Sequence, residues 1–242
     1  MDKPLSSSIL KIIAIISMTI DHIGVVIIYP EFINACMVNG INLMGDMMPY
    51  EARKLYYFYT ATRIIGRIAF PIFAFLIAEG AFKTKDIKKY LSRLLLFAFI
   101  SEIPYDIATN GHIFDMGSQN IFWSLAAGLG MILLIKNRND ISRPKAIILS
   151  VILCTVSAFL SFSLGGIMLI LSFYVFRYDR KRLIPSVFLS TFIMTMTSSL
   201  LQLFSFFAYP FIYLYNGKKG KGNKYLFYAY YPLHFLLLYL LA

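Results

Sequence analysis

Charged residues are scarce in this chain of 242 residues. They make up 14% of the sequence, whereas hydrophobic residues make up 59%. An ordinary soluble domain has about 25% charged residues, and one of this length cannot bury so much apolar surface. The composition therefore excludes a soluble enzyme and a disordered chain, and it predicts that lipid surrounds much of the protein.

Cysteine is almost absent as well. The two cysteines, Cys36 and Cys154, lie far apart in apolar surroundings, with neither a CxxC pair nor a zinc-ligand spacing. The sequence therefore predicts neither a disulfide scaffold nor a metal site. It also lacks a Gly-x-Ser-x-Gly elbow, which is one usual setting of a serine nucleophile.

Apolar stretches alternate with basic clusters along the chain. Two of them, 145–176 and 183–215, are about 30 residues long, which is too long for one membrane crossing. Each has small polar residues or glycine at its centre, a turn signal that divides it in two. The result is nine predicted transmembrane helices: 8–29, 57–82, 88–105, 119–136, 144–161, 164–177, 183–198, 201–216 and 225–241.

The basic residues predict how these helices are oriented. Most of the 23 lysines and arginines lie in four alternate connections, 83–93, 136–145, 177–182 and 218–224. Cytoplasmic loops are enriched in these residues, so we expect a cytoplasmic N-terminus and an external C-terminus. The net charge of +11 then reflects topology, and no nucleic-acid partner is expected. The sequence therefore predicts one all-α integral-membrane domain, 1–242, in a bacterial cytoplasmic membrane.

Ionisable residues inside the predicted helices carry the functional signal, because charge is costly in a bilayer. Lys11 and His22 lie eleven residues apart on the first helix, which puts them on one face about 16 Å apart. Asp21 is turned by about 100° from His22. Arg63 and Arg67 are four residues apart and share a face of the second helix.

The predicted topology collects polar residues from four helices in the outer half of the membrane. They are Asp21, His22, Arg63, Arg67, Glu102, Asp106 and Asn120. We expect Asp21 and Glu102 to pair with the arginines, either as a purely structural cluster or as the frame of a site. His22 is not needed for that charge balance. His234, midway along the last helix, either positions a substrate or hydrogen-bonds a neighbouring tyrosine such as Tyr230.

Two segments together resemble the TraX family, which is named for the membrane protein that acetylates conjugative pilin. One is the spacing of Lys11 and His22 with ten residues between them, and the other is the sequence GRIAFP at 66–71. The sequence QNIF at 119–122 and the aromatic setting of His234 are also similar to the family. The resemblance covers the chain in order and extends distantly to the membrane acyltransferase-3 superfamily.

This resemblance implies a membrane acetyltransferase that uses acetyl-CoA as co-substrate and no metal. By resemblance His22 is the catalytic base, and Lys11 and Arg67 belong to the active-site and donor region. The topology adds Asp21 and Arg63 to the catalytic group. Residues expected to bind or support the substrate are Glu102, Tyr105, Asp106, Asn120 and His234.

The chemistry of acyl transfer agrees with these residues. The reaction needs a base for the acceptor and a positive or hydrogen-bonding group for the developing oxyanion, here Arg67, Arg63 or Asn120. Direct transfer is favoured, with an acetyl-histidine intermediate as the alternative. We expect coenzyme A to enter from the cytoplasm with its phosphates on basic residues. The candidates are Lys11, Lys83, Lys88, Lys89 and Arg93.

Two other functions stay open at this point. Intramembrane His, Asp, Glu and Arg also occur in proton-coupled transporters, although nine helices cannot be divided into the equal repeats that many transporters contain. A scaffold, in which the charges are only structural, is the third reading. The acceptor, an amine or hydroxyl of a pilin-like N-terminus, a glycan or a lipid of the cell envelope, is not determined by the sequence.

Overall fold

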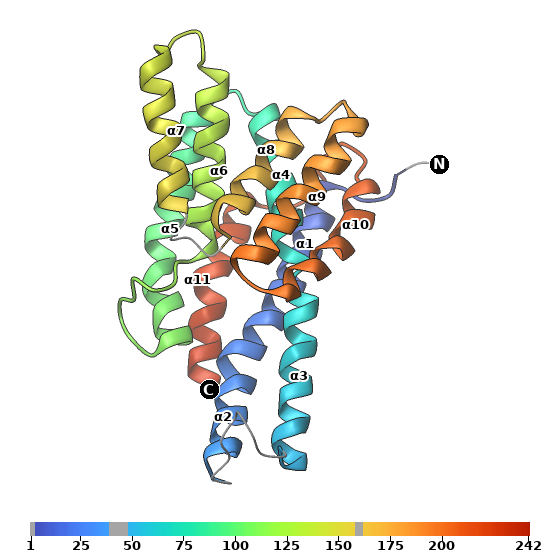
Figure 1. Cartoon of the computed structure of the whole chain (residues 1–242), viewed down its shortest axis with the longest axis vertical. Coiled ribbons are helices and arrows are strands. Elements are labelled where there is room, and N and C mark those ends of the chain that lie inside the picture. The colour runs from blue at the N-terminus through green and yellow to red at the C-terminus, as the bar shows by residue number, and fades with distance from the viewer. Residues whose placement is uncertain (1–2, 39–47, 158–161) are drawn as a thin grey trace.

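The computed structural model describes residues 3–38, 48–157 and 162–242, which form helices and no sheet. Figure 1 shows an elongated bundle in which most helices run along the long axis. The predicted all-α architecture is therefore confirmed for the described residues.

Two long helical rods form the centre of the fold. The first joins α1 (Ser7–Ile23), the π-helix η1 (Gly24–Ile28) and α2 (Tyr29–Val38), and the second joins α3 (Tyr50–Gly66) and α4 (Ala69–Lys83). These two, Ser7–Val38 and Tyr50–Lys83, are the rods in the described part of the chain that are long and apolar enough to cross a membrane. Both extend beyond the predicted spans 8–29 and 57–82.

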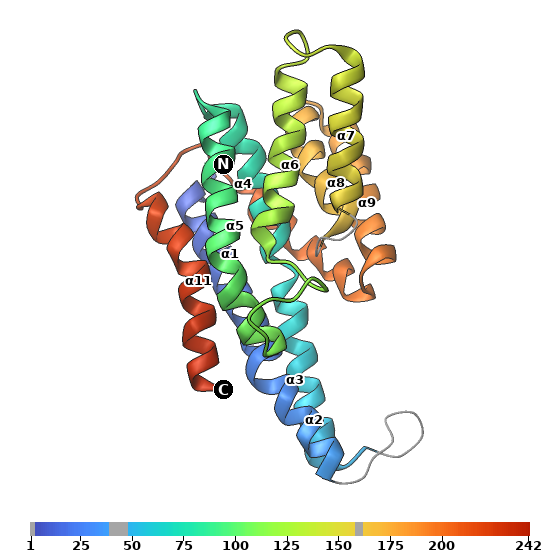
Figure 2. The same ribbon diagram turned by 90° about the vertical axis from the view of Figure 1, so that its left-hand side faces the viewer.

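The remaining helices are shorter and lie beside α1 and α4, whereas α2 and much of α3 extend beyond them at one end (Figures 1 and 2). They are α5 (Ile87–Asn110), α6 (Ile121–Lys136), α7 (Arg143–Ser157), α8 (Ser163–Val175), α9 (Arg180–Thr197), the 3-10 helix η2 (Leu200–Ala208), α10 (Tyr209–Tyr213) and α11 (Lys224–Leu241). Counting helices that join end to end as one, the described residues form nine rods, one for each predicted crossing. The number of these rods that cross a membrane stays a prediction.

Short polar side chains set the beginnings of several helices. Asp86, Asn120, Asp179 and Asn223 each accept a hydrogen bond from a backbone N–H in the first turn of the helix that follows. Such caps satisfy amides that have no partner within the helix. Helix α5 ends at Gly111, whose φ of 72° is the left-handed conformation that glycine adopts without strain.

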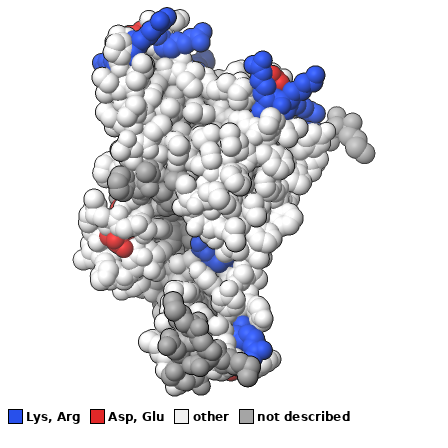
Figure 3. All heavy atoms as spheres, viewed as in Figure 1, with Lys and Arg blue, Asp and Glu red and all other residues white. Residues whose placement is uncertain are grey.

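Apolar side chains fill the core of the bundle and also cover much of its surface. Phe70, Leu129 and Ile170 are almost fully buried where α4, α6 and α8 meet, and Phe235 of α11 is buried in the same apolar cluster. Large apolar side chains also cover the outside, among them Phe99, which is 67% exposed. In the view of Figure 3 the lysines and arginines gather mainly at one end of the long axis, above a broad uncharged surface. Such a surface fits a protein that lipid surrounds.

The four basic connections lie toward the same end of the bundle. Figures 1 and 2 show the α4–α5, α6–α7, α8–α9 and α10–α11 connections at that end, together with the N-terminus. Helix α11 runs away from it, so the described C-terminus lies toward the opposite end. This arrangement is the one that the predicted topology requires.

Candidate functional site

One face of α1 lines two adjoining cavities. The inner cavity, of about 310 Å³, is lined by Ser7, Lys11, Ile15 and Met18, and the outer cavity, of about 330 Å³, is lined by Met18 and His22. These residues recur every three or four positions, so they share one face of the helix. The face predicted from Lys11 and His22 is therefore the face that lines both cavities.

The two cavities meet at a short apolar and aromatic wall. Met18, Ile121 and Tyr231 line both of them. The Tyr231 hydroxyl accepts a hydrogen bond from the Ile121 N–H at 3.3 Å, which holds α11 against the beginning of α6. The inner cavity lies toward the basic end of the bundle, and the outer cavity lies deeper along α1.

An ion-pair cluster forms one wall of the outer cavity. Asp21 accepts hydrogen bonds from Arg63 Nη1 at 2.9 Å and from Arg67 Nη2 at 2.9 and 3.0 Å. The predicted pairing of Asp21 with the arginines is thereby confirmed, and this one carboxylate contacts both of them. One carboxylate faces two guanidinium groups, so a formal excess of one positive charge remains at this wall.

Glycine and proline place these charges. A Cβ atom at Gly66 would lie 2.2 Å from Asp21 Oδ1, and one at Gly24 would lie 2.0 Å from Thr62 Oγ1, so both glycines permit the close approach of α1 and α3. The helix is interrupted at Arg67, because Pro71 cannot donate to the carbonyl four residues earlier. That break separates α3 from α4.

Two histidines meet beside this cluster. His22 Nδ1 lies 2.7 Å from His234 Nε2, and His234 Nδ1 lies 3.1 Å from the Tyr230 carbonyl oxygen. A carbonyl only accepts, so in the neutral pair His234 carries its proton on Nδ1 and accepts through Nε2. His22 must then donate from Nδ1. Its other nitrogen, Nε2, is left as a proton acceptor on a ring that lines the outer cavity.

The polar residues between α5 and α6 have a different environment from the one predicted. Glu102 accepts from Asn120 Nδ2, and from Trp123 Nε1 at 2.7 Å, so the expectation that it pairs with an arginine is wrong. The reason is local, since Asn120 caps α6 through Phe122 N–H and brings both donors next to Glu102. Asp106 accepts from the Asp115 N–H at 2.9 Å and anchors the loop before α6.

Of the predicted support residues, the structure brings Tyr105 and His234 to the site. Tyr105 lines the outer cavity and packs edge-on against Phe235, whose ring also contacts His22 at a centroid distance of 4.4 Å. Glu102, Asp106 and Asn120 instead join α5, α6 and the loop between them.

The outer cavity contains polar residues that sequence reasoning missed. Its lining includes a set of hydroxyl and amide side chains: Thr109, Asn110, Ser118, Gln119, Ser198 and Gln202. Gln202 is only 2% exposed, and its Oε1 has no hydrogen-bond partner among the described residues. The one sign of this residue in the sequence is a glutamine within the mostly apolar stretch 201–216, which the sequence predicts only as a transmembrane helix.

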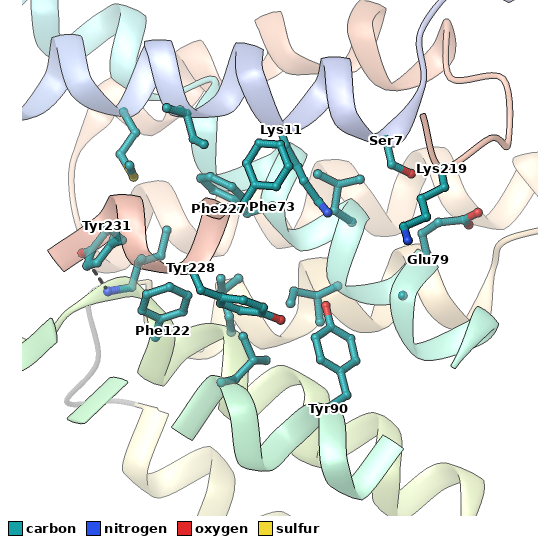
Figure 4. A pocket seen from close by; sticks show the side chains of 18 of the residues that line it. Ser7, Lys11, Phe73, Glu79, Tyr90, Phe122, Lys219, Phe227, Tyr228 and Tyr231 are labelled. Carbon is teal, nitrogen blue, oxygen red and sulfur yellow. Dashed lines mark hydrogen bonds between the residues drawn. The ribbon is translucent and has the colours of Figure 1, made fainter. Parts of the chain in front are cut away.

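The predicted donor-binding lysines separate into two groups. Lys11 and Lys83 line the inner cavity, and a third lysine that we did not predict there, Lys219, joins them (Figure 4). Lys88 and Lys89 lie on the exposed surface at the beginning of α5, outside that lining. Arg93 lies one turn further along α5, with its guanidinium 5.8 Å from the Tyr90 ring.

The inner cavity has mostly apolar walls. Figure 4 shows Lys11 and Lys219 reaching into it from one side, opposite the hydroxyl groups of Tyr90 and Tyr228. Within the part of the chain that the structure describes, no group of three or more His, Cys, Asp or Glu side chains is arranged to hold a metal ion.

Comparison with known proteins gives the following matches. A family described as TraX protein matches residues 6–242. A relative from Dichelobacter nodosus, "Probable fimbrial assembly protein FimC, serogroup H1", is 26% identical over 251 residues, which span 95% of this chain and 92% of that protein. No solved structure matches. The family match includes both cavities and every residue that lines them.

Proposed function

This chain belongs to the TraX family, and on that premise we propose that it is a multi-pass membrane acetyltransferase. It would move an acetyl group from cytoplasmic acetyl-CoA to an amine or hydroxyl of an envelope acceptor. The acetylation of conjugative pilin, for which the family is named, supports the reaction class. The name of the relative, a fimbrial assembly protein, supports an acceptor in the envelope.

The observation that carries the proposal is the hydrogen bond between His22 and His234, since His22 lines a cavity that adjoins a second, lysine-lined cavity. The pair leaves His22 Nε2 free to take a proton, which is the requirement for a general base. The Asp21 carboxylate bonds to the two arginines, and the His22 Nδ1 bonds to His234. Asp21 balances Arg63 and Arg67, so its role is to hold the two guanidinium groups at the cavity wall.

The proposed reaction is a direct transfer. The nitrogen or oxygen of the acceptor forms a bond to the acetyl carbonyl carbon, while its proton moves to His22 Nε2. The carbon–sulfur bond then breaks, and the thiolate leaves with the electron pair and takes up a proton. The excess positive charge of Arg63 and Arg67 beside His22 would stabilise the negative charge on the acetyl oxygen.

The two cavities would divide the substrates between them. The inner cavity, with Lys11 and Lys83, would hold the donor, and the outer cavity, with its hydroxyl and amide lining, would hold the acceptor. The distance from Lys11 to His22 along α1 is about 16 Å. It suits a donor whose anionic group and reactive thioester lie at opposite ends of a long arm.

The test is acetyl transfer by the purified protein from labelled acetyl-CoA to amine and hydroxyl acceptors. We expect His22→Gln to lower the rate by about 100-fold or more, because the general base is lost. His112→Gln is the matched control, since His112 lies exposed in the loop after α5. A His22→Gln protein that is folded and as active as the His112→Gln protein would overturn the assignment.

A further inference from the structure

The connection between α10 and α11 contains a glycine–lysine loop, residues 216–223 with the sequence NGKKGKGN. Backbone hydrogen bonds hold this loop against the beginning of α1. The Ser7 N–H donates to the Lys218 carbonyl at 2.9 Å, and the Ser8 N–H donates to the Lys219 carbonyl at 3.1 Å. Ser8 Oγ also donates to the Lys219 carbonyl, at 2.9 Å. The loop is therefore a fixed part of the inner end of the bundle.

Glycine is required where the loop meets α1. Gly220 has a φ of 75°, and a Cβ atom there would lie 2.3 Å from Ser6 Oγ. Any other residue would be strained in this conformation and would also push the loop away from the helix. The close packing brings Lys219 into the lining of the inner cavity, beside Lys11.

The charge of the inner cavity is not balanced. Among its described lining residues Glu79 is the one acidic group, and it already pairs with Lys83 at 2.7 Å and with Arg177. Lys11 Nζ lies over the Phe227 ring, 4.9 Å from its centroid. Within the described residues neither Lys11 nor Lys219 has a carboxylate partner. Two cations without a counter-ion beside an apolar cavity are unfavourable, so an anionic ligand would stabilise them.

The shape of the cavity selects among anions. Beyond the lysines the walls are apolar and aromatic, and the cavity ends at Tyr231, where the outer cavity begins. An inorganic anion would leave those walls unused. A ligand with phosphates at one end and a slender, mostly apolar arm would occupy the whole length.

We propose that the glycine–lysine loop, through Lys219 and together with Lys11, binds the phosphates of a nucleotide that carries a thioester arm. This inference rests on the proposed acetyl transfer, and it names the place where the donor is held. It assigns the phosphates to Lys219, which lines the cavity, rather than to Lys88 and Lys89, which lie outside that lining. An anionic lipid headgroup has the same phosphate chemistry, so the test must separate the two ligands.

The experiment measures the affinity for coenzyme A by calorimetry, with the full chain in nanodiscs of neutral phosphatidylcholine. We expect Lys219→Gln to weaken binding by about tenfold, because one charge-assisted contact to phosphate is lost. Lys221→Gln in the same loop and Lys181→Gln in the α8–α9 connection are the matched controls, since both lysines, although exposed like Lys219, lie outside the cavity lining. Each should change the affinity by less than about twofold.

Two further arms identify the ligand. Pantetheine, which lacks the phosphates, should bind wild type and Lys219→Gln equally. Gly220→Ala, which keeps every charge but displaces the loop, should weaken coenzyme A binding as Lys219→Gln does. If Lys219→Gln matters only when phosphatidylglycerol is added, the loop binds lipid and the inference is overturned.

The remaining outcomes separate the inference from the proposed function. Equal binding of coenzyme A by wild type and Lys219→Gln overturns the loop assignment and leaves acetyl transfer standing. Binding that depends on Lys219 without any acetyl transfer supports the loop and contradicts the proposed reaction. A wild-type protein that does not bind coenzyme A overturns both.

Discussion

The proton positions on His22 depend on its partner, His234. The Tyr230 carbonyl fixes the proton of His234 on Nδ1, so Nε2 of His234 accepts from His22. This arrangement orients the His22 ring and keeps its Nε2 available. In the proposed reaction His234 would thus be a positioning residue, which acts through His22.

His234→Phe should lower the transfer rate by about 100-fold, because His22 then loses the hydrogen bond that fixes both its ring orientation and its tautomer. The KM for the acetyl donor should stay nearly constant, since His234 does not line the inner cavity. His234→Gln keeps an acceptor for His22 Nδ1 and should restore part of the rate. Steady-state kinetics of the two variants test this, and equal rates for both would show that His234 only fills space.

Asp21 is the counter-ion of both Arg63 and Arg67. Asp21→Asn leaves Arg63 and Arg67 close together without a counter-ion, and we expect it to cost about 3 kcal/mol of unfolding free energy. Arg63→Met in the Asp21→Asn protein removes the repulsion and should recover part of that loss. Unfolding in detergent measures both, and a double variant less stable than Asp21→Asn would contradict the ion-pair account.

At the scale of helices, the close contact between α1 and α3 depends on a glycine. Gly66→Ala should destabilise the protein by about 1 to 3 kcal/mol, because the new Cβ atom would overlap Asp21. Gly130→Ala in α6 is the matched control, since its Cβ atom would lie 3.4 Å from the nearest atom of Leu153. That change should raise stability by about 0.5 to 1 kcal/mol. Unfolding in detergent measures both changes in stability, which should have opposite signs. Helix propensity alone predicts that both substitutions stabilise the protein.

Helical period and helix-breaking residues were enough to predict much at this scale. The shared face of Lys11 and His22 and the nine rods follow from local spacing. The π-helix after His22 was not predictable in this way, because it depends on how Gly24 packs against Thr62. The 3-10 helix η2, expected as part of a regular crossing at 201–216, was missed for a similar reason.

Residues whose partner lies on another helix were harder to assign. Glu102 looked like an arginine partner until the cap at Asn120 placed two donors beside it. The sequence predicts Lys219 only as a basic residue that orients the helices, because the packing of the glycine–lysine loop on α1 leaves no local pattern in the sequence. The environments of Glu102 and Lys219 are both set by contacts between different helices and loops. Residue spacing within one helix does not reveal such contacts.

Across the whole molecule, the basic residues and the apolar surface predict a direction in the membrane. The connection with Lys181 should face the cytoplasm, and the loop with His112 should face outward. With Cys36 and Cys154 replaced by serine, Lys181→Cys and His112→Cys should react with an impermeant thiol reagent from opposite sides. Labelling of both from the same side would contradict the orientation on which the donor path depends.

The central claim is that an acetyl group passes between the two cavities beside His22. The most direct measurement uses proteoliposomes of uniform orientation, with labelled acetyl-CoA on the side of Lys219 and the acceptor on the side of His112. The account predicts a labelled acceptor for wild type, a loss of about 100-fold or more for His22→Gln, and none when the donor is on the other side. Proton flux without a labelled acceptor, or equal labelling by wild type and His22→Gln, would contradict it.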